Sequence, residues 1–230
     1  MNDVTLFTIS VVLCSLVTAV HLDRRLYERE TVGDITKCFL IPTLYFTLYT
    51  ASRAFPREIA RAWMLLLIAF FYTLGDILLL QKKPFSRFVI GAISFSLGHM
   101  AYVIYFSFFG LNIYTLIGGM IIFGIPFFLI IKYVIDNKVK HGMAAIIYAF
   151  TLYLFAVGMS AVFSFKYLKT SILVIIGVIL FMYSDSRIAL RSIMGEKKHT
   201  SFIIMLTYIL ANLFLVLGVW CINVPVDAVI

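Results

Sequence analysis

Long apolar stretches run through this chain almost from end to end, with short polar segments between them. Eight of these stretches have the roughly 17–25 mostly apolar residues that a helix needs to cross a bilayer. They are Val4–Val20, Asp34–Ala51, Ala62–Leu80, Arg87–Phe106, Asn112–Ile131, His141–Phe163, Ser171–Leu190 and Ser201–Cys221. Their apolar character is continuous and does not alternate, as it would in the short strands of a membrane β-barrel. We therefore expect an all-α fold, a polytopic bundle of eight transmembrane helices with short loops.

The composition agrees with a membrane protein. Hydrophobic residues make up 63% of the chain and charged residues 13%, whereas a soluble domain carries about 25% charged residues. The longest polar segment, from His21 to Lys37, is too short to fold by itself, so we expect a single transmembrane domain over residues 1–230. The second apolar stretch is the weakest of the eight, because Asp34 and Lys37 lie at its start.

The net charge of +8 reflects an uneven distribution of Lys and Arg along the chain. Fourteen of these residues lie in or beside the first, third, fifth and seventh loops: Arg24, Arg25, Arg29, Lys37, Lys82, Lys83, Arg87, Lys132, Lys138, Lys140, Arg187, Arg191, Lys197 and Lys198. The other five are Arg53, Arg57, Arg61, Lys166 and Lys169. The positive-inside rule places the fourteen in the cytoplasm and both termini outside it. The basic balance thus describes membrane topology and no nucleic-acid partner.

The cysteines and the N-terminal segment point to no processing or redox chemistry. Cys14, Cys38 and Cys221 lie in or next to apolar stretches and have neither metal-site spacing nor the pattern of a disulfide framework. The residues before the first stretch include no Lys or Arg, so they do not resemble the basic start of a cleavable signal peptide. We expect packing cysteines and an integral protein of a bacterial inner (plasma) membrane, or of the endoplasmic reticulum in a eukaryote.

Two aspartates lie inside apolar stretches. Asp76 is embedded in "FFYTLGDILLL" and Asp185 in "VILFMYSDSRIAL". A charged side chain near the middle of a membrane helix costs roughly 2.5–3.5 kcal/mol on insertion scales. Such residues usually face the interior of a bundle and mark functional sites, so Asp76 and Asp185 are the candidate catalytic residues.

Other polar residues are expected at a similar depth. Asp76 and Asp185 lie about four and five residues before the cytoplasmic ends of their helices, which is on the order of 6–9 Å at the helical rise. Lys37 enters the second helix from the same side. On the sixth, eighth and fourth helices we expect the other contributors to a substrate-binding layer, which are Tyr148, Tyr208, Asn212, His99 and Tyr102.

These residues also have purely structural interpretations. Asp76 could form an ion pair with Lys37, and Asp185 one with Arg187 or Arg191 at the helix end. The histidine could be a hydrogen-bonded core residue, and the tyrosines ordinary packing or interfacial aromatics. The lysine could extend to the membrane surface, as long basic side chains do. The shared depth of the two carboxyls favours a site.

A weak internal repeat accompanies the aspartates. The Gly-Asp pair that ends at Asp76 is followed one stretch later by His99. The Ser-Asp pair that ends at Asp185 is followed one stretch later by Asn212. Four stretches separate the two pairs, so both halves of the chain would have the same orientation in the membrane. This spacing suggests a parallel repeat.

Two buried carboxyls favour general acid–base chemistry. A low dielectric disfavours the charged form of a carboxyl, and two carboxyls that share a site divide into one protonated and one ionised group. Glycosidases use such a pair to protonate an ether-type oxygen and to stabilise an oxocarbenium-like transition state. The chain has no Gly-x-Ser-x-Gly nucleophile elbow. Only one histidine lies deep in an apolar stretch, so the sequence does not offer the ligands of a multi-histidine zinc site.

The sequence resembles the YhhN-like family of multi-pass membrane proteins, whose members include lysoplasmalogenases. The matching segments are "LGDILLL" at Leu74–Leu80, "GAISFSLGHMAYVIYF" at Gly91–Phe106 and "GVILFMYSDSRIAL" at Gly177–Leu190. The Lys-Pro that usually opens the family's second span is Lys37-Cys38 here. The resemblance covers nearly the whole chain, although its motifs are short and specific mainly in combination.

The resemblance implies eight helices and hydrolysis of the vinyl ether bond of lysoplasmalogens to a fatty aldehyde and a glycerophospho-base. It also implies that the aspartates and the histidine carry the activity, with a lysophospholipid and membrane lipids as partners and no metal or organic cofactor. Two alternatives stay open. One is a proton-coupled transporter or channel with a carboxylate relay, and the other is a non-catalytic lipid-binding membrane protein.

Overall fold

The computed structural model describes residues 2–27, 30–55, 58–80, 85–139, 142–194 and 199–223. This part of the chain forms eight α-helices and one 3₁₀ turn, and it contains no strand. The elements are α1 (Asp3–Leu26), α2 (Glu30–Ala54), α3 (Ala62–Leu80), α4 (Phe85–Ser107), α5 (Ile113–Asp136), α6 (Gly142–Ala161), η1 (Phe165–Tyr167), α7 (Leu168–Met194) and α8 (Thr200–Ile222). Each helix covers one of the eight apolar stretches, so the all-α prediction is confirmed.

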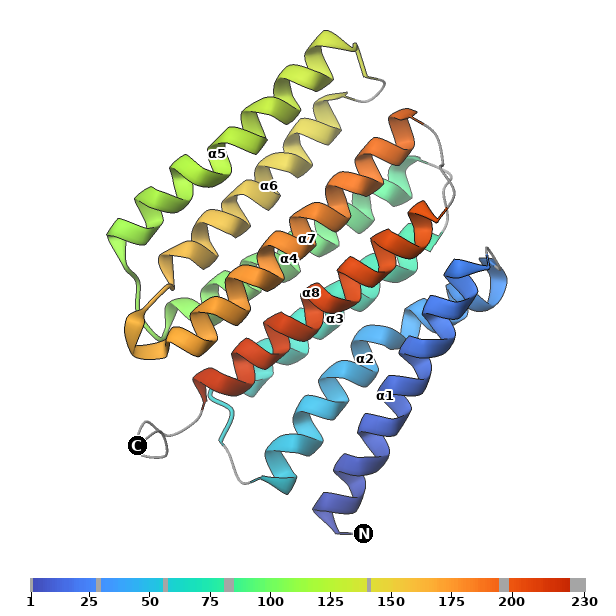
Figure 1. The fold of residues 1–230 in the computed structure, drawn as a ribbon, viewed down its shortest axis with the longest axis vertical. Coiled ribbons are helices and arrows are strands. Elements are labelled where there is room, and N and C mark those ends of the chain that lie inside the picture. The colour runs from blue at the N-terminus through green and yellow to red at the C-terminus, as the bar shows by residue number, and fades with distance from the viewer. Residues whose placement is uncertain are drawn as a thin grey trace.

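Seven of the eight described helices are long and apolar enough to cross a membrane. The exception is α2, which carries Asp34 and Lys37 in its first half and Arg53 in its last turn. Successive helices run in opposite directions along one common axis, so the start of α1 and the end of α8 lie at the same end of the bundle (Figure 1). The ends of α3 and α7, near Asp76 and Asp185, lie at the opposite end (Figure 1).

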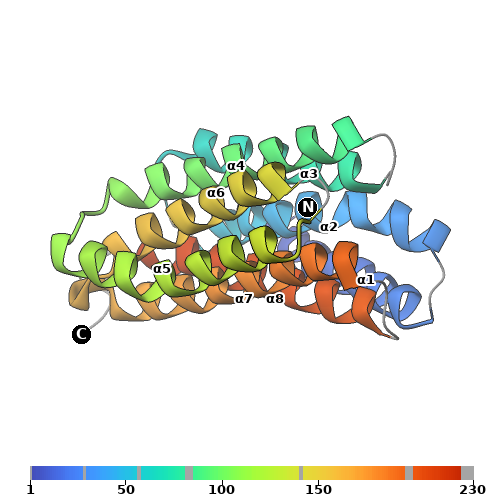
Figure 2. The same cartoon turned by 90° about the horizontal axis from the view of Figure 1, so that it is seen from above.

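Six of the helices form a closed ring. Along this ring α2 packs on α3, α3 on α4, α4 on α6, α6 on α7, α7 on α8, and α8 again on α2. In Figure 2, where the helices run across the picture, α3 and α4 lie on one side and α7 and α8 on the other, with α2 and α6 between them. The remaining two helices lie outside the ring, where α1 packs on α2 and α8 and α5 packs on α6.

The interior of the ring holds polar groups among its apolar side chains, whereas the exterior is mostly apolar. Tyr72, Tyr102 and Phe181 are fully buried in the ring interior. Large apolar side chains such as Leu66 and Ile121 are exposed on the outer faces, as expected of helices whose surroundings are lipid. Apolar residues occupy both the inner and the outer faces of the ring helices. The interior is therefore distinguished by its phenol, imidazole and carboxyl groups.

A close approach between α3 and α4 sets the geometry of this interior. The Ser94 hydroxyl donates a hydrogen bond to the Phe71 carbonyl across the interface, at 2.7 Å. One turn further along α4, a Cβ atom at Gly98 would collide with the Tyr72 ring. Small residues at such positions let two membrane helices approach closely, and here they let Tyr72 reach the centre of the ring.

Candidate functional site

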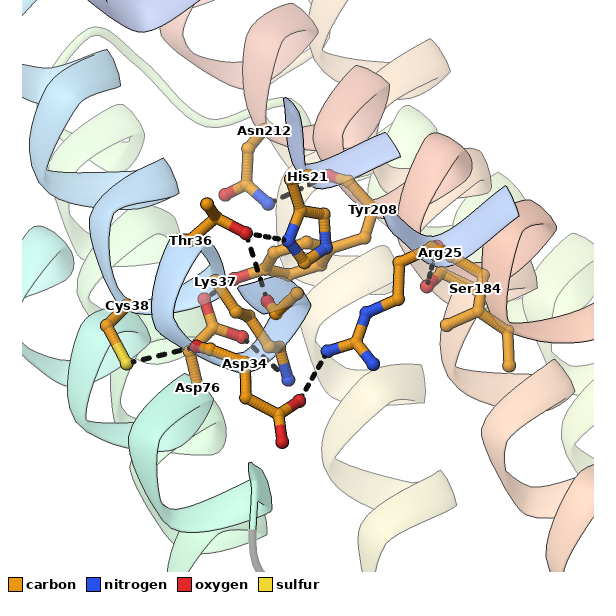
Figure 3. A network of polar contacts seen from close by, with 12 residues as sticks. His21, Arg25, Asp34, Thr36, Lys37, Cys38, Asp76, Ser184, Tyr208 and Asn212 are labelled. Carbon is orange, nitrogen blue, oxygen red and sulfur yellow. Dashed lines mark hydrogen bonds and ion pairs between the residues drawn. The ribbon is translucent and has the colours of Figure 1, made fainter. Parts of the chain in front are cut away.

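Asp76 lies on α3 with 1% of its surface exposed and has two partners from other helices. The Tyr208 hydroxyl of α8 donates a hydrogen bond to its Oδ2 at 2.8 Å. The Lys37 Nζ of α2 lies 3.2 Å from its Oδ1, in an ion pair whose lysine side chain is 13% exposed. Figure 3 shows the lysine reaching from the start of α2 to the carboxylate. The ion pair predicted as a structural alternative for Asp76 is therefore present.

Asp185 lies on α7 with 7% of its surface exposed. The Tyr148 hydroxyl of α6 donates a hydrogen bond to its Oδ2. The neighbouring Ser184 hydroxyl bonds the Ile204 carbonyl at 3.0 Å, which fixes α7 against α8 at this depth. Among the described side chains, Asp185 forms no ion pair with a Lys or Arg, and the Arg191 side chain lies outside the described residues.

The two carboxyls lie close enough to act on each other. Asp185 interacts electrostatically with both Lys37 and Asp76, although 109 positions separate the aspartates in the chain (185 − 76). The structure thus brings together five of the residues that the sequence singled out, which are Lys37, Asp76, Tyr148, Asp185 and Tyr208. Each carboxyl has a phenol donor, and one of the two has an ammonium group as well.

Asn212 lies one turn after Tyr208 on α8. Its amide nitrogen donates a hydrogen bond to the Tyr208 carbonyl one turn earlier, at 2.9 Å. Asn212 is 1% exposed, and its Oδ1 has no hydrogen-bond partner among the described residues. Since a buried polar atom without a partner costs free energy comparable to a lost hydrogen bond, this oxygen is an available acceptor on α8, one turn beyond Tyr208.

His99 is fully buried inside an aromatic box. Its ring stacks on Phe155 at a centroid distance of 4.3 Å and meets the edges of Phe181 at 4.6 Å and of Tyr72 at 5.4 Å. Neither ring nitrogen has a hydrogen-bond partner within the described part of the chain. The interpretation of His99 as a hydrogen-bonded core histidine is therefore wrong, and both nitrogens are free to bind a substrate atom or water.

Tyr102 does not touch either carboxyl. It is fully buried, and its hydroxyl shares a hydrogen bond with the Tyr45 hydroxyl of α2. This pair lies deeper in the ring than the aspartates, because Tyr45 is two helical turns beyond Lys37. The structure assigns Tyr102 to the wall of the interior, and it adds Tyr45, which the sequence analysis did not select.

Tyr72 is the other residue that sequence reasoning missed. Its side chain is fully buried at the centre of the ring, and its hydroxyl has no hydrogen-bond partner among the described residues. The signal was available in the sequence, since Tyr72 precedes Asp76 by four positions and so lies on the same face of α3. Tyr45 follows Lys37 by eight positions, about two turns, which places both on one side of α2.

A second polar cluster surrounds the base of Lys37. The Arg25 guanidinium at the end of α1 pairs with Asp34 at 2.7 Å. The His21 Nδ1 lies 2.9 Å from the Thr36 hydroxyl, and His21 is within electrostatic reach of Arg25 and Lys37. Figure 3 shows these side chains around the start of α2. They hold α1 against α2 at the end of the bundle from which Lys37 enters the ring.

No cluster of three or more His, Cys, Asp or Glu side chains with metal-binding geometry occurs among the described residues. A small pocket near the other end of the ring has room for about one water molecule. It is lined by Phe106, Met159, Val162, Tyr167, Thr170, Ser171, Val174 and Ile222. Since Thr170 and Asp185 are 15 residues apart on α7, roughly 20 Å separates this pocket from the carboxyls. The chemistry-bearing residues belong to the aromatic interior and not to this pocket.

Comparison with protein families identifies the chain. The model of the YhhN family matches residues 33–219, which include every residue of the site described above except His21 and Arg25, so the chain belongs to the YhhN family. No curated protein matches the chain. No solved structure matches it.

Proposed function

Taking membership of the YhhN family as the premise, we propose that this protein is a membrane-embedded hydrolase of lysoplasmalogens. It would cleave the vinyl ether bond at sn-1 and release a fatty aldehyde and a glycerophospho-base. The observation that carries the proposal is that two buried carboxyls, Asp76 and Asp185, lie within electrostatic reach of each other. Each has a phenol donor, and among the described side chains only Asp76 has a directly paired cation. This inequality is what acid–base catalysis by a carboxyl pair requires.

The partners of the two carboxyls divide their roles. Lys37 stabilises the charged form of Asp76 at 3.2 Å, because opposite charges attract strongly where water is scarce. Asp185 has only the Tyr148 phenol as a direct partner among the described side chains. The negative charge of Asp76 nearby disfavours a negative charge on Asp185. Asp185 is thus the proton donor, and Asp76 is the carboxylate that stabilises positive charge.

The reaction then follows the chemistry of vinyl ethers. Asp185 transfers its proton to the β-carbon of the alkenyl group, and the π electrons of the double bond form the new C–H bond. The resulting oxocarbenium ion is stabilised by the Asp76 carboxylate. Water adds to the α-carbon and gives up a proton to a carboxylate. The hemiacetal collapses to the aldehyde, and the glycerol oxygen leaves with a proton.

The surroundings of the site suit a lysophospholipid. Its alkenyl chain would lie among the apolar and aromatic side chains of the ring, and its polar head would lie at the end from which Lys37 enters. If α2 also crosses the membrane, the chain has eight spans, and the positive-inside rule places this end in the cytoplasm. No step of the reaction requires a metal or an organic cofactor.

The test is release of fatty aldehyde from lysoplasmalogen by the purified protein in detergent, where no ion gradient exists. We expect aldehyde and glycerophospho-base in equal amounts, with no release from a lysophospholipid that carries an ester at sn-1. A protein that releases no aldehyde in detergent, but transports protons or solutes after reconstitution in vesicles, would be a transporter and would contradict the proposal. The absence of both activities would favour a lipid-binding protein and would contradict it equally.

A further inference from the structure

The two halves of the molecule repeat one pattern of helix packing. Within the first half, α1 packs on α2, α2 on α3 and α3 on α4. Within the second half, α5 packs on α6, α6 on α7 and α7 on α8. The two contacts that close the ring, between α4 and α6 and between α8 and α2, are equivalent as well. A twofold pseudosymmetry axis along the bundle therefore relates the two halves, and it superimposes α3 on α7 and α4 on α8.

The sequence carries the same repeat at the site. His99 follows Asp76 by 23 positions, and Tyr208 follows Asp185 by 23 positions. The counterpart of His99 is therefore Tyr208, and the pairing of His99 with Asn212 suggested by the sequence is wrong. By the same rule the counterpart of Tyr72, four residues before Asp76, is Phe181, four residues before Asp185.

Side-chain geometry follows the repeat. The Tyr72 and His99 rings meet edge to face, with centroids 5.4 Å apart and an interplanar angle of 75°. Their counterparts Phe181 and Tyr208 also meet edge to face, at 5.6 Å and 69°. Tyr72 and Phe181 contact each other at 5.6 Å. Two equivalent residues can touch in this way only where the axis passes between them.

The repeat is broken at the axis by one hydroxyl group. Phe181 has none, whereas the Tyr72 hydroxyl is fully buried and has no hydrogen-bond partner among the described residues. This hydroxyl lies within electrostatic reach of Asp185 and of the Tyr208 hydroxyl, and the Tyr208 hydroxyl in turn donates a hydrogen bond to Asp76. A buried phenol usually finds a partner, so an unpartnered one this close to Asp185 and to the Tyr208–Asp76 hydrogen bond points to a bound polar molecule.

We propose that the Tyr72 hydroxyl holds the water molecule that hydrolysis consumes, between the two carboxyls and on the axis that relates the two halves of the ring. This role rests on the proposed vinyl ether hydrolysis. The phenol oxygen accepts one water proton in a hydrogen bond, and the Asp76 carboxylate accepts the other. As the water oxygen bonds to the α-carbon, the second proton passes to Asp76 and the π electrons of the oxocarbenium return to its oxygen. Tyr72 is a positioning residue and exchanges no proton.

The kinetic test is the Tyr72→Phe variant, which removes only the hydroxyl. We expect kcat for aldehyde release to fall about 10- to 100-fold, as for a misplaced reactant, with KM and the unfolding temperature unchanged. The matched control is Tyr105→Phe, because Tyr105 is equally buried but its hydroxyl is bonded to Asn223, away from the carboxyls. The double variant Tyr72→Phe/Phe181→Tyr returns a hydroxyl to the axis from the other half, and we expect it to recover part of kcat.

An infrared measurement tests the position of the hydroxyl without substrate. The carbonyl stretch of protonated Asp185 is identified by its loss in Asp185→Asn, and we expect it to shift in Tyr72→Phe and to stay unchanged in Tyr105→Phe. If the wild-type protein is active, an unchanged kcat in Tyr72→Phe would overturn the proposed role of Tyr72. Failure of the double variant to recover any kcat would overturn it as well. An unshifted stretch would overturn its placement beside Asp185. An inactive wild-type protein refutes the hydrolase proposal, and the infrared result then decides the placement alone.

Discussion

Lys37 is the residue that makes the two carboxyls unequal. It reaches from the start of α2 to Asp76, and its side chain is only 13% exposed. A buried ion pair contributes little net stability, but removal of one partner leaves the other charge uncompensated at a cost of about 3–5 kcal/mol. The lysine therefore stabilises the charged form of Asp76 and also makes the fold depend on the ion pair.

The Lys37→Met variant separates these two effects. We expect loss of aldehyde release together with a lower unfolding temperature in detergent, because Asp76 is left without its counter-charge. The double variant Lys37→Met/Asp76→Asn removes both charges, and we expect it to regain thermal stability without activity. Lys132→Met, at an exposed position of α5, is the control. Full turnover in Lys37→Met would contradict the role of the ion pair.

The sequence predicted the three charged residues at the centre of the site, but only some of its tyrosines. Asp76, Asp185 and Lys37 stand out because a charge in an apolar run is costly. Tyr72 and Tyr45 do not stand out among the 13 tyrosines of the chain, since a tyrosine suits both membrane interfaces and protein interiors. Only its spacing from Asp76 distinguishes Tyr72.

The helices were predictable to within a few residues, and α2 shows where pattern alone is insufficient. The stretch Ala62–Leu80 coincides with α3. By contrast, α7 extends to Met194, four residues beyond the predicted end at Leu190. A helix can continue past the bilayer because a polar segment still forms backbone hydrogen bonds there. The charges of α2 lower its apolar character, yet those charges face Asp76 and α1. The order of the helices around the ring, by contrast, depends on packing that no single stretch encodes.

The close contact of α3 and α4 yields a prediction about Gly98. A Cβ atom there would collide with the Tyr72 ring, so we expect Gly98→Ala to lose about 1–3 kcal/mol of stability by overpacking and to displace the Tyr72 hydroxyl, with reduced turnover. Gly118→Ala is the matched control, because a Cβ at Gly118 has no neighbour within 4 Å. Thermal unfolding in detergent, measured on both variants, checks the difference. Equal unfolding temperatures would show that α3 and α4 are not packed this closely.

The arrangement of the whole molecule makes the number of spans testable by parity. An even number of spans puts both termini on one side of the membrane, and an odd number puts them on opposite sides. The start of α1 and the end of α8 lie at the same end of the bundle (Figure 1), and the positive-inside rule places that end outside the cytoplasm. We expect topology reporters fused to the N-terminus and to the C-terminus to report the extracytoplasmic side in both cases. Opposite sides would mean that α2 does not span.

The pairing of carboxyls across the ring is the central claim, and the turnover of purified carboxyl variants measures it most directly. We predict that Asp76→Asn and Asp185→Asn each lower kcat for aldehyde release by about 10²–10⁴-fold. The kcat of the double variant should be only slightly below that of the less active single variant, because mutations of residues that act as a unit have non-additive effects. Asp3→Asn, at the start of α1 with its side chain 46% exposed, should keep wild-type turnover. Substantial turnover in both single variants would contradict the account.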